Sequence, residues 1–119
     1  MPEAAFRPHP RTQLDDNFAS PIRFSLMAAL GDGMEFDFPA LRDILQCGDS
    51  PLSKAIRHLQ TAEYVSARKG TVGGRSRTWV RSTAAGRDAF AAHLQIGAGI
   101  AVARVQTIER DLVQLQARG

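Results

Sequence analysis

Basic side chains surround a Gly-Gly pair in residues 68–81, RKGTVGGRSRTWVR, where five of the fourteen residues are lysine or arginine and none is acidic. Lysine and arginine on a tight turn can neutralise the phosphates of a nucleic acid, and binding of this kind depends strongly on salt. A solvated basic hairpin that only keeps the protein in solution is the alternative interpretation.

The charge along the 119-residue chain is unevenly distributed. Residues 1–49 carry eight acidic and four basic residues, residues 50–87 carry one acidic and eight basic residues, and residues 88–119 carry three of each. A net charge of +3 therefore conceals a basic central block. Such a block on a nearly neutral protein is typical of a face that binds a polyanion.

The residues that could perform other chemistry do not form a recognisable centre. His9, His58 and His93 are scattered, and the chain has no Ser/His/Asp arrangement, no paired histidines with a carboxylate and no phosphate-binding loop of the P-loop kind. Cys47 is the single cysteine, and we interpret it as a buried structural residue rather than a redox sensor. We therefore predict a protein that is not an enzyme and has neither cofactor nor metal site.

No apolar run approaches the roughly 20 residues that span a bilayer. The first residues, MPEAAFRPHPRTQ, lack the apolar stretch of a secretory signal. With one cysteine and no CxxC pair, the sequence predicts a cytoplasmic protein without membrane association.

Three short helices are predicted between residues 20 and 63. The first and the third begin at serine–proline pairs, Ser20-Pro21 and Ser50-Pro51, because serine can cap a helix and proline suits its first position; the second begins at Pro39 and ends at Gly48. Their apolar positions recur at spacings of three and four: Ile22, Leu26 and Leu30; Leu41, Ile44 and Leu45; Leu52, Ile56 and Leu59. A tight turn through CGDS joins the second and third helices, which is the layout of a helix-turn-helix.

Two strands, YVSARKG and RTWVRS, follow and turn at Gly73-Gly74, and Thr83 caps a further helix. Trp79 is interpreted as packing the hairpin against the core rather than stacking on a ligand. Helices followed by a basic hairpin are the order of a winged helix-turn-helix, so the predicted fold is mainly α with a small β-hairpin wing (α+β). In that fold one helix enters the major groove of DNA, and the hairpin, with Arg75 and Arg77 at its tip, follows the backbone and the minor groove.

The last helix carries an apolar seam at alternating spacings of four and three, which is typical of a two-stranded coiled coil. We expect it to form a dimer interface; the alternative is that it folds back on its own domain. Glycine weakens a helix, so a break near Gly97 is a further alternative. The expected domains are a flexible arm over 1–13, a DNA-binding domain over 14–94 and a dimerisation helix over 95–119. The predicted interface residues are Leu94, Ala98, Ala101, Val105, Ile108, Leu112 and Leu115.

Residues 14–94 resemble the MarR-like winged-helix transcriptional regulators, particularly the small single-domain group. The resemblance rests on SPIRFSLMAAL, FPALRDIL, LSKAIRHLQTAEYV and GGRSRTWVRSTAAGRDAF, in that order. TAAGRDAF is similar to the threonine-x-x-glycine-arginine junction of the family, where the second wing strand enters the next helix. The resemblance implies a small-molecule effector that releases DNA, although no residue identifies its pocket.

Four positions depart from the family pattern. The family usually has glycine at Glu63 and often has leucine at Ser82, so we expect a different turn after the third helix and a less well anchored second wing strand. Asparagine and histidine often stand where Pro51 and Ala55 stand here, so base contacts from those two family positions are not carried over.

The sequence is therefore interpreted as a transcriptional regulator, expected to be a repressor, that binds double-stranded DNA as a homodimer on an inverted-repeat operator. The recognition helix is expected over about 50–63 and the wing over about 65–82. The predicted DNA contacts are Ser50, Ser53, Lys54, Arg57, His58, Lys69, Arg75 and Arg77. The alternative is a winged-helix adaptor that binds other proteins and does not read DNA.

Overall fold

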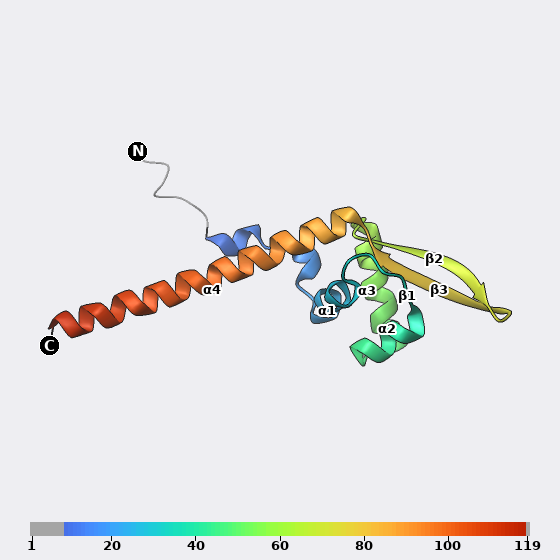
Figure 1. Cartoon of the computed structure of the whole chain (residues 1–119), viewed down its shortest axis with the longest axis horizontal. Coiled ribbons are helices and arrows are strands. Elements are labelled where there is room, and N and C mark those ends of the chain that lie inside the picture. Colours follow the sequence, from blue (N-terminus) through green and yellow to red (C-terminus); the bar gives the residue numbers. More distant parts are fainter. Residues whose placement is uncertain (1–8, 119) are drawn as a thin grey trace. The chain divides into compact units, whose positions relative to one another are not determined.

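The computed structural model describes residues 9–118, which form a mainly helical chain with one three-stranded antiparallel sheet (Figure 1). This architecture confirms the predicted fold class. The elements in chain order are η2 (Pro10–Gln13), η3 (Asp16–Phe18), α1 (Pro21–Leu30), β1 (Phe36–Asp37), α2 (Phe38–Leu45), α3 (Asp49–Thr61), β2 (Val65–Val72), β3 (Arg75–Ser82) and α4 (Ala84–Arg118).

The chain divides into two compact units, one over Asp15–Ala91 and one that combines Met1–Leu14 with Ala92–Gly119. Most of the expected N-terminal arm, residues 1–8, lies outside the described residues. The rest of it includes a short 3-10 helix, η2, where His9 Nδ1 accepts a hydrogen bond from the Arg11 backbone N–H at 3.1 Å.

Helix α1 begins as the serine–proline pair predicts. Ser20 Oγ accepts from the Arg23 backbone N–H at 3.3 Å, and the helix ends before Gly31, whose φ is 55°. One face of α1 is buried through Leu26, Met27 and Leu30. These side chains belong to a core that also contains residues of η3, α2, α3, β2 and β3: Phe18, Leu41, Leu52, Ala55, Ile56, Leu59, Val65 and Val80.

The bounds of α2 and α3 differ from the prediction. Helix α2 ends at Leu45, not at Gly48, because Gln46 adopts the left-handed conformation that closes it. Ile44 was predicted on the buried face, but it is 52% exposed. Helix α3 begins at Asp49 with Gly48 as its cap, so the prediction that Ser50 caps it is wrong.

The sheet contains one more strand than predicted. Its order is β1-β3-β2, with β2 and β3 forming the predicted hairpin around Gly73-Gly74. The additional strand, β1, pairs antiparallel with β3 through Phe36 opposite Val80 and Asp37 opposite Trp79. Two residues are too short to show the alternating pattern by which a strand is found in sequence. In Figure 1 the hairpin extends beyond α1, α2 and α3 as a wing.

The turn after α3 retains the backbone that suits glycine although it contains Glu63. The φ of Glu63 is 63°, in the left-handed region that side chains adopt at a cost. The expectation of a different turn at this position is therefore wrong. Glu63 adopts this conformation despite the energetic cost, and its carbonyl accepts a hydrogen bond from Thr83 Oγ1 at 2.7 Å.

The end of β3 is firmly held, contrary to the expectation drawn from Ser82. This side chain is only 2% exposed, and its Oγ donates to the Gly31 carbonyl at 3.1 Å. Arg87 Nη1 donates to the Ser82 carbonyl at 2.8 Å. Hydrogen bonds at Ser82 thus provide the anchorage that an apolar leucine would obtain by packing.

Helix α4 runs without interruption from Ala84 to Arg118. It begins as predicted at Thr83, whose Oγ1 accepts from the Gly86 backbone N–H at 3.0 Å. The helix also continues through Gly97 and Gly99, so no break occurs there.

Candidate nucleic-acid interface

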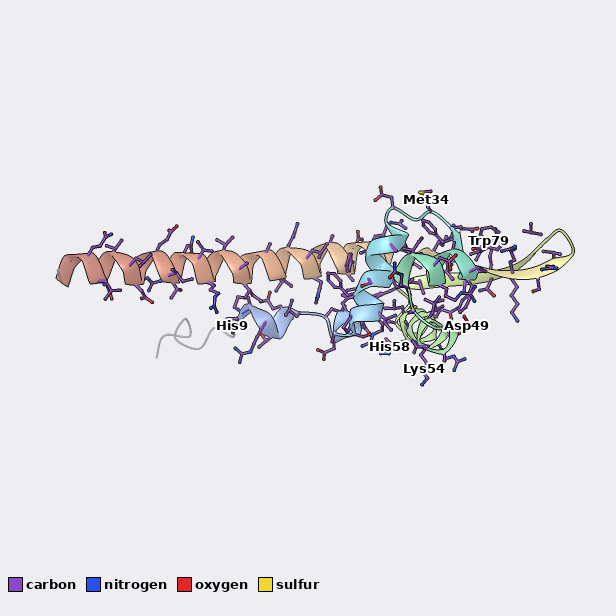
Figure 2. The ribbon with its side chains drawn as sticks, turned by 90° about the horizontal axis from the view of Figure 1, so that it is seen from below. His9, Met34, Asp49, Lys54, His58 and Trp79 are labelled. Atoms are coloured by element: carbon purple, nitrogen blue, oxygen red, sulfur yellow. The ribbon has the colours of Figure 1, made fainter. Side chains whose placement is uncertain are left out.

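The exposed face of α3 carries five of the predicted DNA contacts. Its buried positions, Leu52, Ala55, Ile56 and Leu59, face the core, which leaves the intervening polar side chains in solvent. Figure 2 shows Asp49, Lys54 and His58 along this outer side of the helix. The exposed predicted contacts are Ser50, Ser53, Lys54, Arg57 and His58. Ala55 is buried, so it could not contact a ligand on this face.

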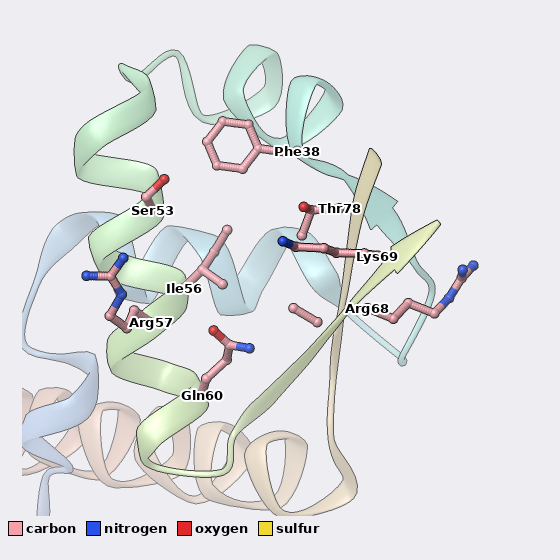
Figure 3. Close-up of a pocket in the computed structure, with 9 residues that line it drawn as sticks. Phe38, Ser53, Ile56, Arg57, Gln60, Arg68, Lys69 and Thr78 are labelled. Atoms are coloured by element: carbon pink, nitrogen blue, oxygen red, sulfur yellow. The ribbon is translucent and has the colours of Figure 1, made fainter. Parts of the chain in front are cut away.

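The wing presents one of its faces to α3. Lys69 lies opposite Thr78 and Ala67 lies opposite Val80, so these residues share a face of the hairpin. A pocket of about 310 Å³ lies between this face and α3 and is lined by Ser53, Ile56, Arg57, Gln60, Lys69 and Thr78 among others. In Figure 3 the Lys69 side chain lies over this pocket, and the Arg68 side chain extends away from it. Cations of α3 and of the wing therefore border one concave surface.

The other face of the wing carries Arg68, Arg75, Arg77 and Arg81, and acidic side chains pair with two of these four. Arg68 forms an ion pair with Glu35 at 2.6 Å and lies over the Trp79 ring, 5.6 Å from its centroid. Arg77 pairs with Asp37 at 2.9 Å. The Arg68 guanidinium, through its hydrogen bonds, lowers the pKa of Glu35 below its ordinary value.

Arg77 consequently differs from its predicted place at the tip. It lies opposite Gly70 in the hairpin, whereas Arg75 lies opposite Val72 next to the Gly-Gly turn. Asp37 Oδ1 also caps α2 by accepting from the Ala40 backbone N–H at 2.9 Å. Arg77 is therefore held at the start of α2, and Arg75 alone is the predicted contact at the turn.

The ion pairs reduce the set of cations that a nucleic acid could meet. On α3 and the wing, the residues that form no salt bridge within residues 9–118 are Lys54, Arg57, Lys69, Arg75 and Arg81. Four of these five were predicted as contacts, and Arg81 was not. Close to α3, Arg42 at the end of α2 pairs with Asp49 in the first turn of α3 at 2.9 Å.

His58 is exposed and is also tied to the segment before α1. Its Nε2 lies 2.9 Å from Asn17 Oδ1. Asn17 is in turn bound to Asp15, whose second carboxylate oxygen accepts from the Tyr64 hydroxyl at 2.6 Å. The hydrogen bond to Asp15 raises the pKa of Tyr64, and partial burial raises it further.

Sequence reasoning missed the acidic partners, Glu35 and Asp37, and the Asp15–Asn17 segment. Asp37 could have been found, because an aspartate two residues before Pro39 is a helix-start signal. The partners of Arg68, Arg77 and His58 are distant in sequence, so only the tertiary structure brings them together.

The predicted dimer residues lie in the unit that contains Ala92–Gly119. Leu94, Ala98, Ala101, Val105, Ile108, Leu112 and Leu115 are all exposed on α4. Three of the large ones, Val105, Ile108 and Leu112, are 52%, 48% and 54% exposed. The single chain thus leaves this apolar seam uncovered.

The described residues hold no cluster of three or more His, Cys, Asp or Glu that could bind a metal ion. Within residues 9–118, no helix combines the length and the apolar character required to span a bilayer. Cys47 is partly buried and packs against the core, as an apolar residue does.

Comparison with known proteins supports the interpretation of this surface. A family model described as a winged helix DNA-binding domain matches residues 22–96, more than half of the chain. No curated protein sequence shows a significant match.

Several solved structures share the fold. A transcriptional regulator homologue from Pyrococcus horikoshii OT3 has a TM-score of 0.69 and 21% identity over 75% of this chain and 88% of that chain. BpsR from Bordetella bronchiseptica has a TM-score of 0.62 and 13% identity over 92% and 83% of the two chains. Apo MarR from E. coli has a TM-score of 0.53 and 13% identity over 89% and 87%.

Proposed function

We propose, from the premise that this chain belongs to the family of winged helix DNA-binding domains, that it is a transcriptional regulator that reads double-stranded DNA as a homodimer. Its action is repression, by occupation of an inverted-repeat operator. Membership of a DNA-binding family also agrees with the prediction that the chain is not an enzyme.

One observation carries the proposal: Arg57 of α3 and Lys69 of the wing, neither of which forms a salt bridge within the described residues, border a single concave surface. An α-helix fits the major groove, which is about 12 Å wide. With α3 in that groove, Ser50, Ser53, Lys54, Arg57 and His58 face DNA. Lys69 and Arg75 then contact the backbone, and Arg75 reaches the minor groove, where a narrow groove concentrates negative potential.

The paired arginines support a division of roles on the wing. Arg68 and Arg77 already bind carboxylates, so moving them to a phosphate would leave Glu35 or Asp37 without its partner. We therefore propose that Arg77 mainly fixes the wing to the start of α2 through Asp37, and that contact with DNA is its minor role.

The dimer is proposed because α4 exposes an apolar seam that a second copy would bury. In this proposal residues 14–94 bind DNA and residues 95–119 dimerise. A two-fold axis relates the two recognition helices, so they reach major-groove segments about 34 Å apart on an inverted repeat. Because DNA is its target, we place the protein in the cytoplasm.

A small-molecule effector is part of the proposal. The DNA binding of BpsR is regulated by 6-hydroxynicotinic acid, and BpsR shares this fold. For the present chain we propose only that a small ligand lowers DNA affinity.

Selection of bound sites from a random duplex pool, followed by titration of the selected duplex at several salt concentrations, tests the function. We expect an inverted repeat and an affinity that falls steeply with salt, because bound phosphates release counterions. A protein that binds no duplex at low salt is instead an adaptor, and the DNA proposal is then wrong.

Single alanine variants separate the contacts. Arg57→Ala should relax base preference at one operator position, where a bidentate base contact contributes about 1–3 kcal/mol of discrimination. Arg75→Ala should weaken binding to all sequences and reduce the salt slope by about 0.9 per lost phosphate contact. Arg110→Ala, an equal loss of charge on α4, is the control and should leave both properties unchanged. Equal losses for Arg57→Ala on specific and random duplexes would make its role purely electrostatic.

A further inference from the structure

A chain of hydrogen bonds links the segment before α1 to the last turns of the recognition helix. Tyr64 donates to Asp15 Oδ2 at 2.6 Å, while Asp15 Oδ1 accepts from both the backbone N–H and Nδ2 of Asn17 at 2.9 Å. Asn17 Oδ1 then faces His58 Nε2 at 2.9 Å. All four residues lie in the unit Asp15–Ala91.

The chemistry of these groups determines which atom donates at each step. An ionised carboxylate only accepts, so the Asn17 amide must turn its NH2 group toward Asp15 and its oxygen toward His58. An amide oxygen also only accepts, so the hydrogen between Asn17 and His58 belongs to Nε2 of the imidazole. The neutral ring is therefore the Nε2–H tautomer, and its Nδ1 carries no hydrogen.

The position of His58 limits what Nδ1 can contact. In a helix-turn-helix the N-terminal residues of the recognition helix contact base edges, and His58 lies in the C-terminal part of α3, which ends at Thr61. With α3 docked as proposed, we expect the sugar–phosphate backbone to be the nearest part of the duplex there. A phosphate oxygen accepts hydrogen bonds, so bare Nδ1 cannot bind it, whereas Nδ1–H of the imidazolium can.

We propose that Asn17 is a positioning residue that holds His58 as its Nε2–H tautomer, so that a DNA phosphate is bound through Nδ1 only after His58 is protonated. This inference rests on the proposed function. DNA affinity then increases as the pH falls through the range in which histidine titrates, about pH 8 to 5. Repressor occupancy of the operator would follow the acidity of the cell interior.

Other groups around His58 do not supply this response. The segment against it carries Asp15, Asp16 and Arg23, its own helix carries Lys54 and Arg57, and Tyr64 follows α3. The ordinary titration ranges of aspartate, lysine, arginine and tyrosine lie outside pH 5 to 8. His9 and His93 are present both in the wild type and in variants at position 58, so comparison of the two proteins isolates the contribution of His58.

The tautomer is tested without DNA by a long-range ¹H–¹⁵N correlation spectrum of the histidine rings. At about pH 8 we expect wild-type His58 to show a protonated Nε2 and a bare Nδ1, and Asn17→Ala to shift the ring toward a mixture of tautomers. The His9 and His93 signals provide an internal reference, and a thermal melt checks that the variant folds. A wild-type ring that is already mixed, and unchanged in Asn17→Ala, would overturn the positioning role.

The phosphate contact is tested with His58→Gln. Glutamine keeps an N–H at the place of Nε2, so it retains the bond to Asn17, but it cannot be protonated. Between about pH 8 and 5, wild-type affinity should rise more than that of His58→Gln, and its salt slope should steepen by about 0.9 for each His58. Equal pH responses would overturn the phosphate contact. Absence of any duplex binding would instead overturn the proposed function and leave the tautomer result standing.

Discussion

Glu63 has a backbone conformation that is better suited to glycine. Its φ of 63° lies in the left-handed region, where a side chain costs about 1–2 kcal/mol. The carbonyl of the same residue accepts from Thr83 Oγ1, and this hydrogen bond helps to hold the conformation.

Glu63→Gly should therefore stabilise the fold. Glycine removes the left-handed penalty but loses more entropy on folding, so we expect a gain of about 0.5–1 kcal/mol in the free energy of unfolding, measured with urea. Gln60→Gly is the control, because Gln60 lies within α3 and should lose about 1 kcal/mol. A loss of stability in Glu63→Gly would contradict the assigned conformation.

Tyr64 is the only tyrosine, so its ionisation can be followed by absorbance. The bond to Asp15 raises its pKa in the folded protein. The folded state thus resists ionisation, and this contribution to stability is present below the unfolded value of 10.0 and is lost as pH rises through the folded pKa. We therefore expect the midpoint of tyrosinate formation in the native protein to lie above the ordinary pKa of 10.0.

Asp15→Asn should lower the pKa of Tyr64 toward its ordinary value, because the carboxylate is the first cause of the shift. The variant should also unfold less steeply in alkali than the wild type. Asp16→Asn is the matched control, since the Asp16 side chain is not among the causes of the Tyr64 shift. A Tyr64 titration that is identical in Asp15→Asn and the wild type would show that the hydrogen bond does not determine it.

At the scale of elements, the threonine-x-x-glycine-arginine junction joins β3 to α4 through close backbone contact. A Cβ on Gly86 would lie 2.1 Å from the Tyr64 carbonyl oxygen. The same carbonyl accepts from the Thr83 backbone N–H at 3.0 Å. The turn after α3 and the first turn of α4 thus meet at a spacing that only glycine allows.

Gly86→Ala should destabilise the chain by about 1–3 kcal/mol, because backbone atoms would have to move. Gly99→Ala is the matched control in the same helix, where an added Cβ meets nothing within 4 Å. The control should gain up to about 1 kcal/mol from helix propensity. Thermal unfolding of both variants checks the pair, and equal effects would show that the close approach does not occur.

At the scale of the whole molecule, the apolar seam of α4 is exposed, and the single chain does not bury it. Four large apolar residues on it, Val105, Ile108, Leu112 and Leu115, are between 48% and 63% exposed. A soluble protein rarely leaves such a stripe uncovered. In the proposed dimer this seam would also link assembly to DNA affinity, because we expect each half-site alone to bind weakly.

We expect a dimer at micromolar concentration and a monomer for Ile108→Asp with Leu112→Asp, measured by light scattering, with residues 14–94 still folded. Val113→Asp is the control, because Val113 is 63% exposed but lies outside the seam, and it should remain dimeric. A wild-type monomer, or a dimeric double variant, would remove α4 from the interface and with it the argument for an inverted repeat.

The sequence by itself determined the order and type of the long elements. Serine and threonine caps marked the starts of α1 and α4, and the Gly-Gly pair marked the wing turn. These signals act between residues a few positions apart, so they are visible in the chain alone. The basic character of α3 and the wing was predictable for the same reason.

Only the tertiary structure decided which of the basic residues remain available. Glu35 and Asp37 lie far from Arg68 and Arg77 in sequence and neutralise them across the sheet, and Asn17 reaches His58 from before α1. A short strand such as β1 is likewise determined by the partner strand with which it pairs. Contacts between distant residues depend on how the whole core packs, and no local pattern contains them.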